Sequence, residues 1–295
     1  MKKVLITGAN SYIGTSFDNW IKENAPHIQV DTVDMIGESW KTADFSSYDA
    51  VFHVAGIAHA DVGKVTEEQK LLYYRVNAGL TEECAKKAKA EGVKQFVFMS
   101  SIIVYGESAG IGRERVITQD TPLTPANFYG DSKVKAEEAI LPLTDDDFKV
   151  VILRPPMIYG KGSKGNYPLL SKFAKKLPLF PNVHNQRSML YVGNLCKFIA
   201  CVIEREESGI FYPQNKEYVN TGEMVKQIAS VQGKKIWITG IFNPALKLMG
   251  KLGGKPGGIV NKAFGNLVYD QAMSEYDFEY RIYNLEESIR LTEAD

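Results

Sequence analysis

Val4-Leu5-Ile6-Thr7-Gly8-Ala9-Asn10-Ser11-Tyr12-Ile13-Gly14 is the stretch that decides the fold of this 295-residue chain. Val4 to Thr7 reads as a buried strand, and the residues from Tyr12 to Asn24 read as a helix. A tight glycine turn between a strand and a helix aims the unpaired N–H groups of the helix at a bound anion. The stretch therefore predicts a binding site for the diphosphate of a dinucleotide. Its predicted contacts are Gly8, Asn10, Ser11, Tyr12, Ile13 and Gly14.

Three positions of this turn carry separate tasks. Gly8 makes the turn, and Gly14 lets the helix pack closely on the sheet. Ser11 stands where such turns usually have another glycine. Its side chain narrows the approach of the backbone to a phosphate, although its hydroxyl is also able to donate a hydrogen bond.

The rest of the first half repeats the alternation of strand and helix. Further strands are expected at 30–34, 50–54, 95–100 and 150–153, with a helix at 72–91. This order predicts an α/β fold: a Rossmann-like doubly wound parallel sheet with a smaller C-terminal substrate-binding lobe. Residues 1–160 form the predicted NAD-binding domain, whose sheet is completed by part of 188–220. Residues 161–295 form mainly the substrate-binding lobe.

Acidic residues near the strand ends bear on the choice of cofactor. Asp34 follows Gly14 by twenty residues at the end of the second predicted strand, where a carboxylate binds the ribose hydroxyls. The same carboxylate repels a 2′-phosphate, so NAD is favoured over NADP. Asp31 is a rival because strand ends are uncertain by a few residues. Asp44 and its neighbour Phe45 are expected near the adenine, with an ordinary loop as the alternative.

The composition excludes several classes of protein. Lysine plus arginine and aspartate plus glutamate both number 35, so the zero net charge gives no support for nucleic acid as a partner. Three cysteines without metal-ligand spacing predict no metal site and fit a reducing, cytoplasmic compartment. No run of about 20 apolar residues is present, so no membrane span is expected.

Tyr129-Gly130-Asp131-Ser132-Lys133 places a phenol and an ammonium four residues apart. Thr124-Pro125 predicts the start of a helix and Pro142 its end, so both groups share one helix face. A nearby cation favours the phenolate. Lowering a tyrosine pKa by about three units requires roughly 4 kcal/mol of differential stabilisation. By spacing alone, the pair is also compatible with an exposed helical pair of no function.

Together these residues resemble the extended short-chain dehydrogenase/reductase superfamily, and within it the NAD-dependent sugar-nucleotide epimerase/dehydratase family of UDP-hexose 4-epimerase-like enzymes. The resemblance runs from Val4 to about Cys201. Its motifs are the glycine turn, His53-Val54-Ala55-Gly56, Val76-Asn77, Ser100-Ser101-Ile102-Ile103-Val104-Tyr105-Gly106, the Tyr129/Lys133 pair and Arg154-Pro155-Pro156-Met157-Ile158-Tyr159-Gly160.

The resemblance implies a role for each matching position. Tyr129 is implied as proton acceptor and donor, Lys133 as the residue that binds the nicotinamide ribose and lowers the tyrosine pKa, and Ser101 as the partner of the reacting sugar hydroxyl. Implied cofactor contacts, besides the turn and the acids above, are Val54, Ala55, Gly56, Asn77, Ser100, Tyr129, Lys133 and Pro155. Implied substrate contacts are Ser101, Met157, Asn166 and Arg187, the last toward the diphosphate.

Departures from the family pattern narrow the chemistry. Ile102 and Ile103 occupy the positions of the Asp-Glu pair of 4,6-dehydratases, and isoleucine supplies neither a general acid nor a base. Dehydration is therefore rejected. Met157 replaces a substrate-contacting asparagine that is frequent in hexose 4-epimerases. The connection from Asp44 to the third strand is short, and the family's arginine-rich segment near the C-terminus is not recognisable.

Three functions follow from this pattern. The first is 4-epimerisation of a UDP-hexose or UDP-N-acetylhexosamine, and the second is NAD(P)H-dependent reduction of a UDP-4-keto-6-deoxy sugar in polysaccharide synthesis. The third is a non-catalytic NAD-sensing regulator, which is disfavoured because the Tyr/Lys pair is retained. A homodimer is also expected, built from the helices around 72–91 and 126–141, with Leu80, Cys84, Val134 and Ile140 as apolar candidates. The acid-free stretch that contains Lys247, Lys251, Lys255 and Lys262 reads as a solvated lobe edge, with an anionic substrate or a membrane surface as alternatives.

Overall fold

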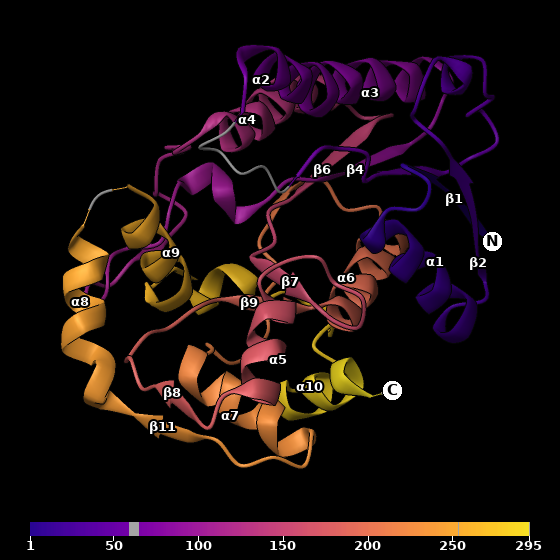
Figure 1. The fold of residues 1–295 in the computed structure, drawn as a ribbon. Coiled ribbons are helices and arrows are strands. Elements are labelled where there is room, and N and C mark those ends of the chain that lie inside the picture. The colour runs from indigo at the N-terminus through magenta and orange to yellow at the C-terminus, as the bar shows by residue number, and fades with distance from the viewer. Residues whose placement is uncertain (59–64, 253, 295) are drawn as a thin grey trace.

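A six-stranded parallel sheet forms the centre of the described part of the chain (Figure 1). The computed structural model describes residues 1–58, 65–252 and 254–294, and the side chains of 254–256 also lie outside the described part. The strand order is β10-β6-β4-β3-β1-β2. The bounds of these strands are β1 (Lys2–Thr7), β2 (Ile28–Val33), β3 (Ala50–His53), β4 (Gln95–Met99), β6 (Lys149–Leu153) and β10 (Gly209–Phe211).

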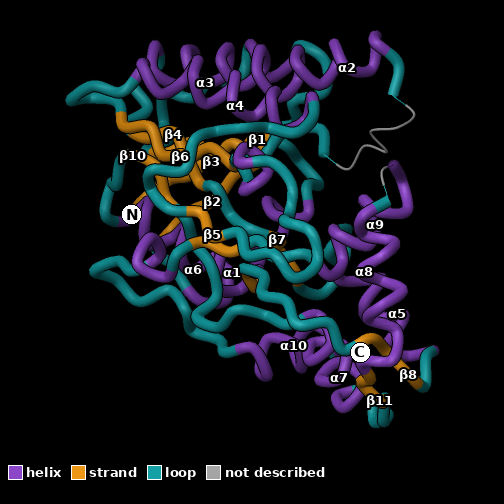
Figure 2. Tube along the Cα trace, turned by 90° about the vertical axis from the view of Figure 1, so that its left-hand side faces the viewer, coloured by secondary structure: helices purple, strands orange, loops and turns teal. Residues whose placement is uncertain are grey.

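Helices cover both faces of this sheet, which is the doubly wound arrangement expected from the sequence (Figures 1 and 2). On one face lie α1 (Tyr12–Asn24) and α6 (Val192–Glu204). On the other lie α2 (Glu67–Tyr74), α3 (Leu80–Ala90) and α4 (Phe128–Ile140). A π-helical turn, η2 (Arg75–Gly79), joins α2 to α3. The strands β3 and β4 are buried along their whole length, as parallel strands covered on both faces must be.

The chain reverses its direction of sheet growth between β1 and β3. From β1 it moves outward to β2 and then returns to the other side of β1, where Val4 pairs with both Val30 and Ala50. The carboxyl ends of β1 and β3 therefore meet at a switch point of the sheet. Crevices at such a switch point are where doubly wound sheets bind ligands.

Several predicted element bounds differ from the structure by a few residues, and two of them lie near the predicted site residues. The helix that carries Tyr129 and Lys133, α4, begins at Phe128, and its N-cap is Asn127, whose side chain accepts from the Gly130 N–H at 3.1 Å. The predicted cap, Thr124, instead donates its hydroxyl to the carbonyl of Tyr105 at 3.1 Å. Thr124 therefore lies in the loop before α4 and does not cap the helix. The second strand ends at Val33, one residue before its predicted end at Asp34.

The C-terminal lobe contains short paired strands and helices around a core of its own. Parallel pairs join β8 to β11, β5 to β12 and β7 to β9, which the sequence pattern did not predict. The strands are β5 (Val116–Ile117), β7 (Met157–Tyr159), β8 (Leu179–Pro181), β9 (Met189–Tyr191), β11 (Trp237–Thr239) and β12 (Val268–Tyr269). The helices are α5 (Tyr167–Lys176), α7 (Thr221–Val231), α8 (Asn243–Lys251), α9 (Gly254–Phe264) and α10 (Leu285–Glu293).

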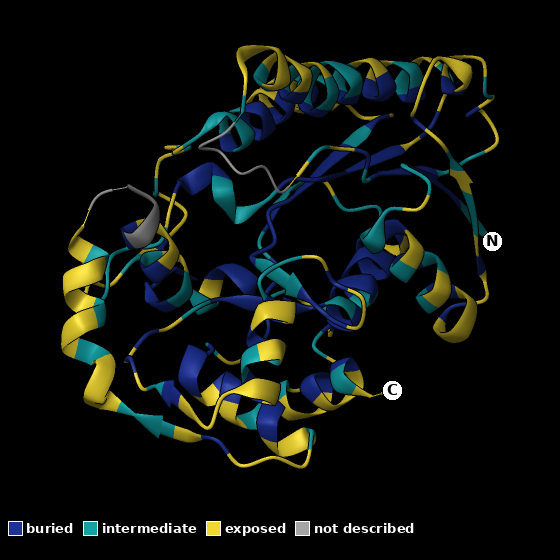
Figure 3. Cartoon of the chain, in the orientation of Figure 1, coloured by how far each residue is buried: buried dark blue, intermediate teal, exposed yellow. Residues whose placement is uncertain are grey.

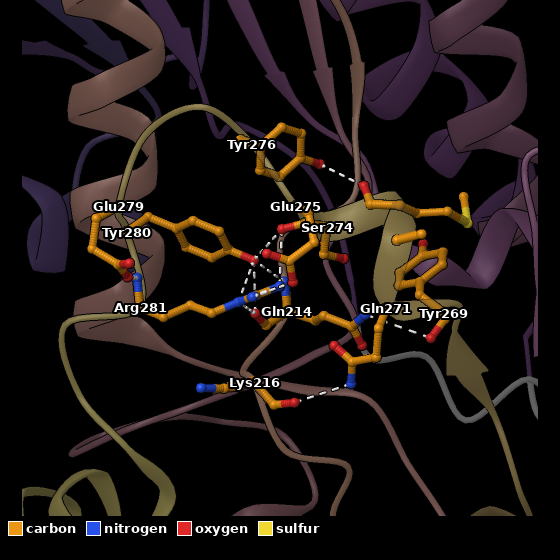
Figure 4. A network of polar contacts seen from close by, with 12 residues as sticks. Gln214, Lys216, Tyr269, Gln271, Ser274, Glu275, Tyr276, Glu279, Tyr280 and Arg281 are labelled. Carbon is orange, nitrogen blue, oxygen red and sulfur yellow. Dashed lines mark hydrogen bonds and ion pairs between the residues drawn. The ribbon is translucent and has the colours of Figure 1, made fainter.

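A polar network fixes the segment after β12 against the segment after β10 (Figure 4). The Tyr280 hydroxyl donates to the Gln214 carbonyl at 2.8 Å, and the Gln214 N–H donates to that hydroxyl at 3.2 Å. Arg281 donates to the Ser274 carbonyl at 2.9 Å. These contacts hold the lobe to the edge of the sheet at which β10 lies. None of the described helices is long and apolar enough to cross a lipid bilayer.

Candidate active site

The glycine turn after β1 has the close backbone approach that its sequence predicts. Gly8 has a φ of +102°, and a Cβ there would lie 2.9 Å from the amide nitrogen of Ala55. A Cβ at Gly14 would lie 2.6 Å from Ser11 Oγ. Both positions thus exclude a side chain. A cavity of about 210 Å³ opens at the turn and is lined by Ile6, Gly8, Ala9, Asn10, Gly14, Thr15, Asp18 and Thr32.

Ser11 replaces the missing glycine as a helix cap. Its Oγ accepts from the Gly14 N–H at 3.1 Å, which satisfies one of the N–H groups that a helix start leaves unpaired. Its hydroxyl proton stays available for a ligand. The N–H groups of Tyr12 and Ile13 lie at the same helix start, while the Ile13 side chain packs into the core. Asn10 is exposed with a φ of +63°.

Tyr12 has a buried hydroxyl without a hydrogen-bond partner among the described residues. Burial is the main cause that raises its pKa well above the usual value for tyrosine. A Cβ at Gly160 would lie 2.7 Å from this oxygen, so the ring joins the turn to the loop after β7. An unsatisfied polar atom at the edge of the turn fits a site that receives a polar ligand.

The acidic residues near β2 and β3 take different positions. Asp34 follows β2 directly, is exposed, and lies next to the turn because the Gly8 N–H donates to the Val33 carbonyl at 3.0 Å. Asp31, the alternative to Asp34, does not lie at the end of β2. It pairs with Leu5 in the middle of the strand and accepts from the Tyr48 hydroxyl at 3.2 Å.

Asp44 and Phe45 form a loop before β3. Asp44 is exposed, and its hydrogen bonds from Ser46 lower the pKa of its carboxyl. The Phe45 side chain is fully buried, and its N–H donates to Glu91 Oε2 at 2.6 Å. The Phe45 ring is buried in the core and its amide is bonded to Glu91, so neither group is free for the predicted contact with the cofactor.

Asn77 lies behind the wall that Val54, Ala55 and Gly56 form. Its Oδ1 accepts from the Ile57 N–H at 2.7 Å, and its Nδ2 donates to the Ile57 carbonyl and to Ser132 Oγ, each at 3.0 Å. The side chain is fully buried and all its groups are used. Asn77 thus holds the segment after Gly56 in place, and its predicted contact with the cofactor stays a prediction.

His53 is a buried residue of the same motif for which the sequence predicted no role. Thr81 donates its hydroxyl to the Asn77 carbonyl at 2.9 Å, so it must accept from His53 Nε2 at 3.0 Å. Thr7 then donates to His53 Nδ1 at 2.6 Å. Burial lowers the pKa of His53 to about 3, and the charge of Lys133 acts in the same direction. His53 is therefore a neutral link between β1, β3 and α3.

Lys133 is buried on α4 and points at the carboxyl end of β4. Its Nζ donates to the Met99 carbonyl at 2.8 Å and lies 4.6 Å from the centre of the Phe98 ring. A Cβ at Gly56 would lie 3.5 Å from Nζ, so this glycine keeps the amine next to the segment after β3. Burial lowers the pKa of Lys133 to about 8, which the charge of Glu137 partly opposes.

Tyr129 lies one turn before Lys133 on the same helix face. Burial raises the pKa of its phenol to about 12, with a smaller contribution from Tyr73, whose ring meets it edge-on at 6.2 Å. The protein without ligands therefore holds Tyr129 protonated. A neutral phenol of pKa about 12 needs roughly 7 kcal/mol of added stabilisation of its anion to ionise near neutral pH.

Ser101 stands at the start of η3 (Ile102–Tyr105), against which α4 packs. A Cβ at Gly130 would lie 2.9 Å from the Ile103 carbonyl oxygen, so glycine permits this close approach beside Tyr129. Ser101 Oγ accepts from the Ile103 N–H at 3.3 Å and keeps its proton for another partner. The Ile102 N–H donates to the carbonyl of Pro155 at 2.9 Å, which joins this turn to the end of β6.

A buried ion pair below the catalytic residues had no place in the sequence prediction. Arg154 donates to both carboxylate oxygens of Glu137, with Nη2 2.5 Å from Oε2, and its Nη1 donates to the Tyr105 hydroxyl at 2.7 Å. Ser100 donates its hydroxyl to the same carboxylate. The Ser100 hydroxyl thus faces Glu137, and its predicted contact with the cofactor stays a prediction. The four-residue spacing of Tyr129, Lys133 and Glu137 was the signal available.

The predicted substrate residues lie on the lobe side. Arg187 donates to the carbonyls of Lys262 at 2.8 Å and Gly265 at 3.3 Å, and to Ser108 Oγ at 3.4 Å. Burial lowers its pKa to about 10, and it forms no ion pair with any described residue. Met157 is half-buried at the start of β7, and Asn166 stands before α5 without a side-chain hydrogen bond to that helix.

This arrangement defines an enzyme of the extended short-chain dehydrogenase/reductase type that binds a nicotinamide dinucleotide. Within the described residues, no group of three acidic, histidine or cysteine side chains is arranged to hold a metal ion. The sequence profile of the NAD dependent epimerase/dehydratase family matches residues 4–212, and the chain belongs to that family.

Two curated relatives and one solved structure are similar to this chain. It is 32% identical over 290 residues to the UDP-glucose 4-epimerase of Vibrio cholerae, covering 91% of this chain and 87% of the relative. It is 29% identical to the N-acetyl-alpha-D-glucosaminyl-diphospho-ditrans,octacis-undecaprenol 4-epimerase of Escherichia coli O157:H7, covering 75% and 64%. The UDP-glucuronic acid 4-epimerase of Bacillus cereus, solved with NAD, has the same fold, with a TM-score of 0.72, 17% identity and coverage of 98% and 96%.

Proposed function

We propose that this enzyme is a 4-epimerase of a UDP-hexose or UDP-N-acetylhexosamine. The observation that carries the proposal is the group of Ser101, Tyr129 and Lys133 at the carboxyl ends of β4 and β6, with isoleucines beside it. Neither Ile102 nor Ile103 is able to exchange a proton, so the chemistry is confined to one carbinol carbon.

The chain's own residues move the proton in this reaction. Tyr129 takes the proton of the 4-hydroxyl and returns it, while the free O–H of Ser101 donates to the reacting oxygen. The ammonium of Lys133 favours the phenolate by its charge. A bound nicotinamide dinucleotide supplies hydride acceptance and return at C4. Because burial opposes the phenolate, positive charge at the site must provide the roughly 7 kcal/mol that ionisation near neutral pH needs.

NAD is the proposed cofactor. The exposed carboxylate of Asp34 lies at the end of β2 beside the turn, and Asp18 lines the cavity at the same turn. Two carboxylates favour ribose hydroxyls and oppose a 2′-phosphate. We expect Asp34→Asn to weaken NAD binding about tenfold and NADP binding much less, because a charge-assisted hydrogen bond is lost. Titration of each dinucleotide by tryptophan fluorescence measures the difference.

Arg187 supports a glycosyl diphosphate as substrate. A half-buried guanidinium that is bonded only to neutral oxygens and has no ion-pair partner among the described residues is complementary to an anion. The two curated relatives act, by their names, on sugars that are joined to a diphosphate, one nucleotide-linked and one lipid-linked. The shared group is the diphosphate, and UDP is the carrier proposed here.

The homodimer and the cytoplasmic location remain proposals. Of the apolar candidates on the α3–α4 layer, Cys84, Val134 and Ile140 are buried within the chain, and Leu80 packs against the same core. The exposed Leu71 on α2 is therefore a better candidate for a contact between subunits. All three cysteines are buried and unpaired, which fits a reducing compartment.

Purified enzyme with NAD and a panel of UDP-glucose, UDP-galactose and their N-acetyl forms tests the proposed reaction. We expect NMR to show interconversion of a 4-epimer pair without net change in nicotinamide absorbance. Arg187→Met should raise KM about 10–100-fold with a nearly unchanged kcat, since a charge-assisted contact is lost. Arg205→Met, which removes a surface pair with Asp277, is the matched control. If all four sugars stay unchanged and NADPH is consumed only with a UDP-4-keto-6-deoxy sugar, the reductase alternative replaces the epimerase.

A further inference from the structure

The segment without acidic residues extends beyond the stretch that contains Lys247, Lys251, Lys255 and Lys262. Residues 224–269 contain seven lysines and neither aspartate nor glutamate. Among the described side chains, the lysines just before β11 and on α8 and α9 are exposed. They are Lys234, Lys235, Lys247, Lys251 and Lys262. This edge of the lobe is cationic although the whole chain has no net charge.

The same edge exposes large apolar side chains. Figure 3 shows α8 almost wholly exposed, and no residue of that helix is buried. The exposed fractions are 77% for Trp237, 76% for Ile241, 65% for Leu248, 54% for Leu252 and 67% for Ile259. Phe242 and Met249, at 40% each, add to the set. Soluble proteins rarely leave so many large apolar groups together in water without a use for them.

Close contacts between α8 and α9 hold the two helices against each other. A Cβ at Gly257 would lie 1.8 Å from the Leu252 carbonyl oxygen, and a Cβ at Gly250 would lie 2.8 Å from Asn261 Oδ1. Asn261 also donates to the Gly250 carbonyl at 3.0 Å. Glycines thus bring the two helices together on their inner side. Lys247, Leu248, Lys251 and Leu252 are exposed. The α8 helix that carries the first three lies at the margin of the ribbon, next to β11 in the chain (Figure 1).

This surface adjoins the proposed diphosphate site. Arg187 donates to the carbonyl of Lys262 in the last turn of α9. A Cβ at Gly265, just after α9, would lie 2.2 Å from the carbonyl oxygen of Ala109, so the end of the helix is packed against the loop after η3. The exposed helix pair and the half-buried Arg187 guanidinium therefore belong to one packed unit.

Charge decides between two occupants for this surface. In a symmetric pair of subunits the same patch would meet itself, so lysines would face lysines with no acid between them. The anionic surface of a lipid bilayer offers the opposite charge and an apolar layer for the leucines and Trp237. A mixed cationic and apolar surface of this kind is complementary to a bilayer.

We propose that the outer surface of β11, α8 and α9 docks the enzyme on an anionic lipid bilayer, with the mouth of the Arg187 site at the level of the lipid headgroups. The attachment is peripheral and reversible. It goes beyond the reaction proposed above and does not depend on which sugar is turned over.

Flotation of the full chain with vesicles tests this proposal without substrate. We expect binding to vesicles of equal parts phosphatidylcholine and phosphatidylglycerol, and little binding to phosphatidylcholine alone. Lys247→Gln with Lys251→Gln should lower the partition coefficient about fivefold for each lysine, and added salt should act similarly. Leu248→Glu with Leu252→Glu should lower it at least a hundredfold.

Leu291→Glu is the matched control, because Leu291 is 44% exposed on α10 in the same lobe. Its partition coefficient should equal that of the unaltered protein. The proposal is overturned if the unaltered chain fails to float with anionic vesicles, or if the Leu248/Leu252 variant floats equally well. It is also overturned if that variant only converts a dimer to a monomer in sedimentation velocity, which would assign the surface to a second copy. An unchanged melting temperature shows that each variant is folded.

Discussion

The catalytic region on α4 and the outer surface on α8–α9 use their side chains in opposite ways. The two charged groups of α4 that face the sheet are buried and have fixed partners: Glu137 pairs with Arg154, and Lys133 donates to the Met99 carbonyl. On α8 the apolar groups are exposed, and Leu248 has no core to enter. The side chains of the first region are held in place before a ligand binds. The apolar side chains of the second region would be removed from water only by a partner outside the chain.

The largest effect expected in the catalytic region comes from Tyr129→Phe. This change removes the only proton carrier that the proposed mechanism uses, so turnover should fall about 10³–10⁴-fold. The matched control is Tyr73→Phe, because that phenol lies against Tyr129 without a role in proton transfer. Steady-state kinetics on the productive UDP-sugar measure both. Equal losses in the two variants would contradict the assignment.

The buried ion pair gives the next largest effect. Glu137→Gln leaves Arg154 charged and uncompensated, and such a change typically costs about 3–5 kcal/mol in the free energy of unfolding. Urea denaturation measures it. Glu286→Gln removes an exposed pair with Arg290 and should cost less than about 0.5 kcal/mol. Similar costs for both would mean that burial does not distinguish the two pairs.

Lys133 gives the comparison a dependence on pH. Its pKa falls from 10.5 in the unfolded chain to about 8 in the folded one. Below pH 8 the folded protein therefore carries a buried, protonated Lys133, which lowers the free energy of unfolding. That cost amounts to roughly 3 kcal/mol and disappears as pH rises from 8 to 10.5. Lys133→Met should therefore be more stable than the unaltered enzyme at neutral pH, and the difference should shrink over that range. A difference independent of pH would contradict the buried ammonium.

The smallest effect on stability belongs to the outer surface. Leu248→Ser should change the free energy of unfolding by less than about 0.5 kcal/mol, since the side chain is already in water. The matched change in the core, Leu190→Ala, should cost about 2–5 kcal/mol because Leu190 is fully buried. Thermal or urea unfolding of both variants measures the contrast. A large loss for Leu248→Ser would show that α8 contributes to the core after all.

The sequence was sufficient to predict the parallel sheet and to place Tyr129 and Lys133 on one helix, because both features depend on short-range patterns. The strand–turn–helix around Gly8 and the four-residue spacing of Tyr129 and Lys133 are each readable within a few residues. What it missed depends on register or on distant contacts. Asp31 and Asp34 differ by the exact end of one strand, and the N-cap moved from Thr124 to Asn127 because Thr124 bonds to Tyr105.

Long-range polar partners were out of reach for the same reason. Nothing near Ser100 in the sequence indicates that its hydroxyl faces Glu137, or that Glu137 is already paired with Arg154. The amide of Phe45 is taken by Glu91, forty-six residues away. The apolar positions on α3 and α4 were ambiguous between core and interface, because periodicity does not say which of two partners a helix face meets.

The hydrogen bond from Arg187 to the carbonyl of Lys262 connects the proposed diphosphate site to the proposed bilayer surface. An anion that draws the guanidinium toward itself alters the preferred position of the last turn of α9, and a displacement of α9 alters the affinity for the anion. Thermodynamic reciprocity requires the two factors to be equal. The affinity of a glycosyl diphosphate in the presence and absence of vesicles would then report the same coupling as the affinity of the protein for vesicles with and without that ligand.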